Sequence, residues 1–361
     1  MKRFLYSLLS VAFTFFLLTT SCTHDKEDYT LVPTENKTGQ DDEAENKTDD
    51  NGSNLSDPEN GNVDSPIIPY FDNPPLPIGK ETLRILAIGN SYTLDGTAYL
   101  QDLLDNLGLN RSRYCVMLAM RANSSLQTWS EIYEDESIEP WLQRQAGTLE
   151  VDYYHAPLKK LLSQPWDIVV LQQVSYYAIT YLTYAPWLRT LIDAVQTHCT
   201  NPDVCLAWHL VHSYSDSYIY NGGMLSEKRW ANISASAQLV ARHDGINVII
   251  PMGTAIQNAR NSKLENATDL TRDHIHLGLG VARYVAACTW VGTLFDPVFG
   301  TQMTELTANH PLTSAEEDGT GFDSFILGSS IAVTDDNRPL CLQCAHWACT
   351  APYQITTEYT E

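Results

Sequence analysis

Short apolar runs recur along the chain from residue 83 onward. They lie at residues 83–88, 113–120, 167–171, 204–211 and 246–251. Each run is too short for a buried helix and is rich in Ile, Val and Leu, and some runs are nearly continuous. Runs of this kind are typical of strands that are buried on both faces of a sheet. We therefore expect five strands, one at each of these ranges.

Helical patterns lie between the expected strands. One apolar stripe recurs at helical spacing and ends at a glycine stop signal: Tyr99, Leu100, Leu103, Leu104, Leu107 and Gly108. Similar patterns cover about 185–198 and 226–243. Because strand–helix alternation repeats about five times, the sequence predicts an α/β fold, a three-layer α/β/α sandwich with a central, mostly parallel five-stranded sheet. Ligands bind at the carboxyl ends of the strands in such folds, so candidate chemistry is expected there.

The first 22 residues have the order of an export signal. A cationic start is followed by the apolar residues 4–18, by small residues at 19–21 and then by Cys22. This order is typical of a secretory signal, and the apolar run is too short to span a bilayer, which takes roughly 20 residues. A cysteine in this place resembles a bacterial lipobox, although Thr19 stands where leucine is preferred. We expect a signal peptide at 1–21 and lipidation of Cys22; an ordinary signal peptide with an incidental cysteine is the alternative.

An acidic segment follows the expected signal. Residues 23–66 hold thirteen Asp or Glu against three Lys and almost no large apolar side chains. Such a segment cannot bury enough surface to offset its ordering entropy. We expect a disordered tether at 22–78 and one domain at 79–361. Residues 26–28 (Lys-Glu-Asp) resemble acidic signals that send some outer-membrane lipoproteins to the cell exterior, and more acidic linker is the alternative.

Composition excludes several classes of partner and site. The formal net charge is −22, and affinity for nucleic acid rests on Lys and Arg, so nucleic acid is not an expected partner. Seven cysteines follow Cys22, and an odd number in an oxidising compartment leaves at least one free thiol. Cys341 and Cys344 recur with apolar neighbours at helical spacing, which indicates core residues, because a zinc site would need a second ligand pair. We expect no metal and no organic cofactor.

A serine stands where the first expected strand ends. Gly89-Asn90-Ser91 follows that strand and precedes a helix. Ser91 would lie on a turn with its own backbone N–H near the positive end of the helix. A hydroxyl beside a donor for a developing oxyanion is what acyl transfer requires. The alternative is a helix cap, because Ser, Thr and Asn are the usual caps.

A carboxylate and a histidine stand three residues apart near the other end of the domain. Asp273 and His276 lie at a junction between a loop and an apolar helix. The carboxylate could orient one imidazole nitrogen and leave the other free to take a proton from a serine. Metal ligation by His274 and His276 is the rival interpretation, and no further ligand set completes it.

These two segments resemble the motifs of a known superfamily. Gly89-Asn90-Ser91 resembles the first block of the SGNH (GDSL-like) hydrolases, and Asp273-x-x-His276 resembles their last block. Over about 80–350 the chain resembles an uncharacterised family of SGNH-type bacterial lipoproteins, through residues 88–93, 167–173, 250–255 and 270–277. The resemblance implies a flavodoxin-like fold with Ser91 as nucleophile, His276 as general base and Asp273 as its orienting carboxylate. His274 stands where glycine is frequent.

The oxyanion-binding blocks depart from this resemblance. SGNH hydrolases use a glycine N–H after the second strand and an asparagine amide after the third. Residues 121–126 contain no glycine, so we expect the backbone N–H of Ser124 or a neighbour there, beside the N–H of Ser91. Residues 172–175 contain no asparagine, so the expected amide donor is Gln173 (or Gln172).

Two further groups of side chains follow the third and fourth expected strands. His209 and His212 are three apart and would face opposite sides of a strand, so we expect buried or rim histidines that do not share one metal. Aromatic side chains there would suit stacking on sugar rings, and ordinary loop packing is an equal alternative: Tyr176, Tyr177, Tyr181, Tyr184, Trp187, Tyr214, Tyr218 and Tyr220.

The sequence thus predicts an exported, lipid-anchored serine ester hydrolase that removes small acyl groups, such as acetyl, from glycans. We expect an outer-membrane lipoprotein of the cell envelope that is held to the membrane only by its lipid. The sequence is compatible with exposure of this lipoprotein at the cell surface. One alternative is a surface glycan-binding lipoprotein with the same fold and little or no catalysis. Another is a metal-dependent hydrolase that uses His274, His276 and the histidines at 209 and 212.

Overall fold

A computed structural model describes residues 67–151, 155–218, 222–264, 266–312 and 330–356 of the chain. The chain divides into a unit that ends at Val63 and a second unit that begins at Asp64, and all described residues belong to the second. The expected signal peptide, the lipidation site Cys22 and the tether up to residue 66 lie outside the described residues. Every helix in the described part is too short or too polar to span a bilayer.

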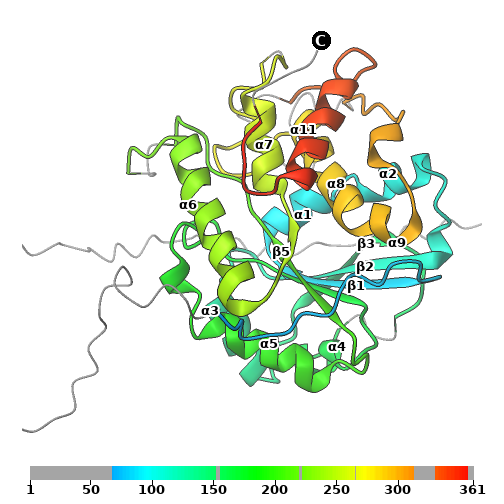
Figure 1. Cartoon of the computed structure of the whole chain (residues 1–361), viewed down its shortest axis with the longest axis vertical. Helices are drawn as coiled ribbons and strands as arrows, with labels where there is room; N and C mark the ends of the chain where they lie inside the picture. The colour runs from blue at the N-terminus through cyan, green and yellow to red at the C-terminus, as the bar shows by residue number, and fades with distance from the viewer. Residues whose placement is uncertain (1–66, 152–154, 219–221, 265, 313–329, 357–361) are drawn as a thin grey trace, which may run out of the picture. The chain divides into compact units, whose positions relative to one another are not determined.

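One mostly parallel sheet runs through the described residues (Figure 1). Its strand order is β3-β2-β1-β4-β5-β6, and β1 pairs in parallel with both β2 and β4. The five expected strands are present, and a sixth, β3, pairs antiparallel to β2 at one edge. The six strands are β1 (Leu83–Gly89), β2 (Tyr114–Met120), β3 (Trp141–Gly147), β4 (Ile168–Leu171), β5 (Cys205–His209) and β6 (Val248–Ile250).

Strand β3 corrects the predicted strand count. Its sequence, Trp-Leu-Gln-Arg-Gln-Ala-Gly, is polar at its centre, and about half of the Trp141 side chain is exposed. An edge strand pairs on one side only and is partly solvated, so it carries no continuous apolar run. The rule that found the buried strands therefore could not find this one.

Helices cover both faces of the sheet, which confirms the predicted three-layer sandwich. In Figure 1, α3, α4 and α5 lie on one side of the sheet, and α1, α2, α7, α8 and α11 lie on the other, where they pack against one another. The first group is α3 (Leu126–Glu134), α4 (Leu158–Leu162) and α5 (Trp187–His198). The second group is α1 (Ser91–Thr97), α2 (Leu100–Asn106), α7 (Met252–Arg260), α8 (Val281–Trp290) and α11 (Arg338–Thr350).

The remaining helical segments extend or flank these layers. Helix α6 (Ser226–Leu239) packs against α7 and continues into a π-helical turn, Val240–Asp244. Helix α8 likewise continues through a π-helical turn, Val291–Phe295, into α9 (Asp296–Phe299). On α11, Cys341 and Cys344 are fully buried, as expected of core residues.

The folded domain begins earlier than residue 79, which corrects the predicted boundary of the tether. Phe71 is buried, and the Tyr70 N–H donates to the His243 carbonyl. At Gly245, whose φ is +89°, an added Cβ would lie 1.9 Å from the Phe71 carbonyl oxygen, so only glycine allows this approach. Residues 67–78 carry neither a helical nor a strand period, so their packing was not visible in the sequence.

Asn73 completes the end of β5. Pairing between β5 and β6 begins at Ala207, one residue after Leu206. The Asn73 side chain takes the place of a strand there. Its Nδ2 donates to the Leu206 carbonyl at 2.8 Å, and the Leu206 N–H donates to its Oδ1 at 2.8 Å.

We expect Asn73→Ala to destabilise the domain by about 1–3 kcal/mol, because the substitution leaves a backbone N–H and a C=O of a central strand without partners. Urea denaturation of the purified protein measures this. The matched control is Asp72→Ala at the exposed neighbouring position, where the change should stay within about 0.5 kcal/mol. Equal effects of the two substitutions would contradict the role given to Asn73.

Candidate active site

The turn after β1 presents Ser91 as the first residue of α1. The Asn90 side chain accepts a hydrogen bond from the Tyr92 N–H at 3.0 Å and so caps this helix. Its Nδ2 donates to the Ser124 carbonyl at 3.1 Å, which ties the turn to the segment after β2. At Gly89 an added Cβ would lie 2.3 Å from Thr93 Oγ1, so the close fold-back of α1 requires glycine.

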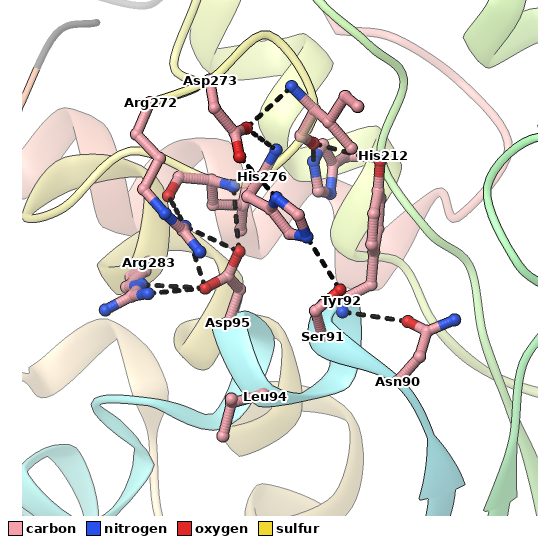
Figure 2. A network of polar contacts seen from close by, with 12 residues as sticks. Asn90, Ser91, Tyr92, Leu94, Asp95, His212, Arg272, Asp273, His276 and Arg283 are labelled. Atoms are coloured by element: carbon pink, nitrogen blue, oxygen red, sulfur yellow. Dashed lines mark hydrogen bonds and ion pairs between the residues drawn. The ribbon is translucent and has the colours of Figure 1, made fainter. Parts of the chain in front are cut away.

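Ser91, His276 and Asp273 form one hydrogen-bonded chain (Figure 2). His276 Nε2 lies 2.8 Å from Ser91 Oγ, and His276 Nδ1 lies 2.7 Å from Asp273 Oδ2. A carboxylate only accepts, so we assign the hydrogen of the neutral imidazole to Nδ1. Nε2 then carries the lone pair that faces the serine hydroxyl. The structure thus brings together the three residues that the sequence singled out.

Asp273 is ionised at neutral pH. Burial by itself raises the pKa of this carboxyl, but hydrogen bonds from the side chain and backbone of His276 and from the Ile275 N–H outweigh it. The pKa is therefore held well below its usual range. Asp273 Oδ1 accepts from the His276 N–H at 2.6 Å and from the Ile275 N–H at 3.0 Å, so one carboxylate orients both the ring and the backbone.

His274 takes no part in this chain. Its backbone is left-handed, with φ of +71°, a conformation that glycine adopts without strain. Its Nδ1 lies 3.2 Å from Ser217 Oγ, and its carbonyl accepts from the Ser215 N–H. Of the tandem histidines, it is His276 that contacts Ser91.

Two buried side chains hold the loop that carries Asp273 and His276. The Ile275 carbonyl accepts from the Tyr92 hydroxyl at 3.0 Å and from His212 Nε2 at 2.7 Å. The His212 ring also stacks on Tyr92, with centroids 4.2 Å apart. Burial lowers the pKa of His212 to about 3, so the ring is neutral and its hydrogen lies on Nε2. The sequence predicts a buried or rim histidine at position 212. It carries no signal for the contact with the Ile275 carbonyl, because the two residues are 63 positions apart.

His209 is the buried last residue of β5. Its Nδ1 lies 3.2 Å from Gln172 Oε1, and its Nε2 lies 3.3 Å from Met252 Sδ. The same Gln172 oxygen accepts from Thr93 Oγ1 at 2.7 Å, which places this glutamine beneath α1. Burial lowers the pKa of His209 to about 3. Within the described ranges, no group of three His, Cys, Asp or Glu side chains is placed to hold a metal ion.

Asp95 joins α1 to the loop and to α8 (Figure 2). The carboxylate is 1% exposed and accepts from Arg272 Nη1 at 2.9 Å, from Arg283 Nη2 at 2.7 Å and from the Leu277 N–H at 3.0 Å. Burial raises the pKa of Asp95, but the two guanidinium groups outweigh burial and lower it below its usual range. Because α1 begins at Ser91, this network fixes Ser91 relative to His276.

A cavity of about 560 Å³ opens at the Ser91–His276 pair. It lies at the carboxyl ends of the strands, where the fold predicts a ligand site. Its walls are formed by the ends of several loops and include four tyrosines. The lining residues are Asn90, Ser91, Tyr92, Ala122, Asn123, Val174, Ser175, Tyr176, Tyr214, Tyr218, Ile275 and His276.

The structure corrects the prediction for Gln173. Its carboxamide is buried, its Oε1 accepts from the Leu126 and Val174 N–H groups, and its Nε2 donates to the Thr183 carbonyl. The side chain therefore braces the backbone and does not line the cavity. Strand ends place successive side chains on opposite sides, and the sequence alone did not tell which side faces the serine.

Asn123 replaces Ser124 as the candidate donor after β2. The Ser124 N–H donates to the Arg121 carbonyl at 3.4 Å, and Ser124 is buried outside the cavity wall. Its neighbour Asn123 lines the cavity and has φ of +57°, a left-handed conformation that asparagine tolerates better than most residues. The candidate backbone N–H after β2 is therefore that of this neighbour of Ser124.

We expect Asp95→Asn to destabilise the protein by about 3–5 kcal/mol, because it leaves two buried guanidinium groups without their carboxylate. Chemical denaturation measures the free energy of unfolding. The matched control is Asp105→Asn, which breaks the exposed ion pair with Arg111 and should cost at most about 1 kcal/mol. A similar cost for both variants would show that Asp95 does not hold the site.

The buried histidines predict loss of stability in acid. The pKa of His209 and of His212 is about 3 in the folded protein and about 6.5 when unfolded, so the unfolded state binds more protons between these values. The free energy of unfolding should therefore fall as the pH falls from about 6.5 towards 3. His209→Gln should reduce this slope in denaturation curves at several pH values, whereas His346→Gln, at an exposed position, should not.

Comparison with known proteins shows what the chain is similar to. A crystal structure of a DUF4886 family protein from Bacteroides uniformis has 24% sequence identity and a TM-score of 0.61, and the alignment covers 76% of this chain and 98% of that chain. A Parabacteroides merdae protein described as a GDSL-like lipase has 15% identity and a TM-score of 0.41 over 61% of this chain and 99% of that chain.

An acetyl xylan esterase has 15% identity and a TM-score of 0.39 over 58% of this chain and 98% of that chain. No curated protein matches the chain. The sequence itself matches one family, whose description is a domain of unknown function. The expected resemblance is confirmed: residues 154–305 match DUF4886, and the chain has the fold of the Bacteroides uniformis member.

Proposed function

We propose that this protein is a serine ester hydrolase that acts through Ser91, His276 and Asp273. The observation that carries the proposal is the continuous hydrogen-bonded chain from the serine hydroxyl through the imidazole to the carboxylate, at 2.8 Å and 2.7 Å. A serine, a base and an orienting group in this order are the components of nucleophilic acyl transfer. The serine also opens into a cavity that can hold a substrate.

In the first half-reaction, Ser91 Oγ attacks the ester carbonyl carbon while its proton passes to His276 Nε2. The carbonyl oxygen becomes an oxyanion, for which the N–H groups of Ser91 and Asn123 are the candidate donors. Collapse of the intermediate breaks the bond to the alcohol oxygen, which takes the proton from His276. Asp273 holds the imidazolium in place by charge and by hydrogen bonding.

In the second half-reaction, water attacks the acyl group on Ser91. His276 Nε2 takes one proton of that water and then returns it to Ser91 Oγ as the carboxylic acid leaves. Ser91 and His276 are therefore the side chains that exchange protons in the two half-reactions, and no further group of the protein is needed for the proton balance. The geometry supports this sequence because Nε2 faces the Ser91 hydroxyl, while Nδ1 remains bonded to Asp273 throughout.

We extend the proposal to small acyl esters of carbohydrates, such as acetylated glycans, in the cell envelope. Tyr176, Tyr214 and Tyr218 line the cavity, and about 40% of Tyr176 is exposed. Aromatic rings beside the serine give the apolar face of a sugar ring a surface to stack on, and their hydroxyls can bond its rim. The export signal and lipidation at Cys22 that the sequence predicts would hold the enzyme where such glycans occur.

A glycan-binding lipoprotein with little catalysis is the second candidate. The observation that favours it is the commitment of the Gln173 carboxamide to the backbone, which removes the amide donor expected from the sequence. Loss of one such donor typically lowers turnover by about 10²–10³-fold. Such a binder would show no ester turnover as the wild-type protein, and it would keep its affinity for a glycan after Ser91→Ala.

Hydrolysis of p-nitrophenyl acetate by the purified protein tests the serine esterase. We expect Ser91→Ala and His276→Ala to lower kcat by at least about 10³-fold, because each removes a part of the acyl-transfer machinery. His274→Gly is the matched control and should retain turnover, because glycine adopts the left-handed conformation of this position. Turnover that survives Ser91→Ala, or that is lost with His274→Gly and kept with His276→Ala, would overturn the assignment.

A further inference from the structure

Three hydroxyl groups gather at the wall of the cavity. Ser175 and Tyr214 both line it, both are at least 94% buried, and their hydroxyl oxygens lie 2.8 Å apart. Tyr92 also lines the cavity, and its hydroxyl donates to the Ile275 carbonyl at 3.0 Å.

The sheet brings the segment of Ser175 close to the nucleophile. Ser91, Asn123 and Ser175 follow β1, β2 and β4, which are neighbours with β1 in the middle. The strands are parallel and end level with one another, because Gly89 pairs with Met120 and the preceding residue of β1 pairs with Leu171, at the end of β4. All three segments consequently converge on the same cavity, which Ser91, Asn123 and Ser175 all line.

A buried cation supports this group of hydroxyls. The Arg229 guanidinium lies 3.9 Å from the centre of the Tyr214 ring, and its Nη2 donates to the Ser175 carbonyl at 3.0 Å. Arg229 is 4% exposed, so its charge acts through a medium of low polarity. A positive charge here stabilises negative charge that develops on a substrate in the cavity.

The hydrogens can be assigned by elimination. The Tyr92 hydroxyl donates its single hydrogen to the Ile275 carbonyl. Tyr214 can donate to Ser175 Oγ, which leaves the Ser175 hydrogen free to turn. An oxyanion is a stronger acceptor than a neutral phenol, because hydrogen bonds to charged acceptors are roughly twice as strong.

We propose that the Ser175 hydroxyl is the third oxyanion donor of this enzyme, with Tyr214 and Arg229 as its positioning residues. The proposal rests on the serine esterase function proposed above. As the tetrahedral intermediate forms, the Ser175 O–H turns to the oxyanion, and its proton stays on Ser175. No bond other than hydrogen bonds changes at this residue. The new bond exists only when the oxyanion does, so it lowers the barrier without tightening substrate binding.

Kinetics of Ser175 variants with p-nitrophenyl acetate test the proposal. Ser175→Cys keeps nearly the same side-chain volume but offers only a weak S–H donor, so kcat should fall about 10²–10³-fold with KM nearly unchanged. Ser175→Thr retains the hydroxyl and should stay within about tenfold of the wild-type kcat. A fall of less than tenfold in Ser175→Cys, or an equal fall in both variants, would overturn the proposal.

Tyr214→Phe tests the support from the neighbouring phenol. It keeps the ring under Arg229 and removes only the hydroxyl, so kcat should fall about tenfold, as for loss of one neutral hydrogen bond. Tyr70→Phe is the matched control, because the Tyr70 hydroxyl bonds the exposed Asp193 and lies outside the cavity wall. An unchanged kcat in Tyr214→Phe would remove Tyr214 from the proposal.

Inactivation by a fluorophosphonate gives a second readout that does not depend on the identity of the ester. Ser91 Oγ displaces fluoride from phosphorus, and the phosphoryl oxygen occupies the place of the oxyanion. The second-order rate constant should fall in Ser175→Cys in parallel with kcat, while thermal melting shows that the variant is folded. A wild-type protein that neither turns over esters nor reacts at Ser91 would overturn the serine esterase and with it this proposal. A reactive Ser91 with a full rate in Ser175→Cys would overturn this proposal alone.

Discussion

The buried carboxylate of Asp95 is the interaction on which the site depends. Ser91 begins α1, while Asp273 and His276 lie on a loop that has no strand or helix of its own. Asp95 contacts that loop at the Leu277 N–H and at Arg272, and it reaches α8 through Arg283. Three charged groups withdrawn from water are stable only together, so the loop has one position relative to Ser91.

The loop itself is shaped by contacts at its backbone. A bridge between Thr271 and Leu277 closes its ends, and residue 274 is left-handed within it. At its tip the Ile275 carbonyl receives donors from Tyr92 and His212. Charge at one end and neutral hydrogen bonds at the other therefore orient the imidazole. Substitutions in this layer would act on geometry, although none of these side chains belongs to the hydrogen-bonded chain at the serine.

Sequence patterns were sufficient where a feature is local. The buried strands have continuous apolar runs, and Asp273 and His276 are close enough in sequence to be seen as a pair. Edge strand β3 and residues 67–78 were missed, because half-solvated or irregular segments carry no period. The prediction of Gln173 as an amide donor was wrong for a different reason. Gln173 lies in the expected segment, but only the three-dimensional structure shows which way its side chain turns. The contact of His212 with residue 275 links distant segments and has no sequence signal.

The two halves of the hydrogen-bonded chain are far apart along the polypeptide. Ser91 and His276 are separated by 185 positions, and the Asp95–Leu277 contact spans 182. Closing so long a stretch has an entropic cost that must be met by the folded core between the two ends. The contact between the two side chains can form only after the whole intervening chain has been made. A nascent chain that ends before residue 276 carries Ser91 without the imidazole that faces it in the folded domain.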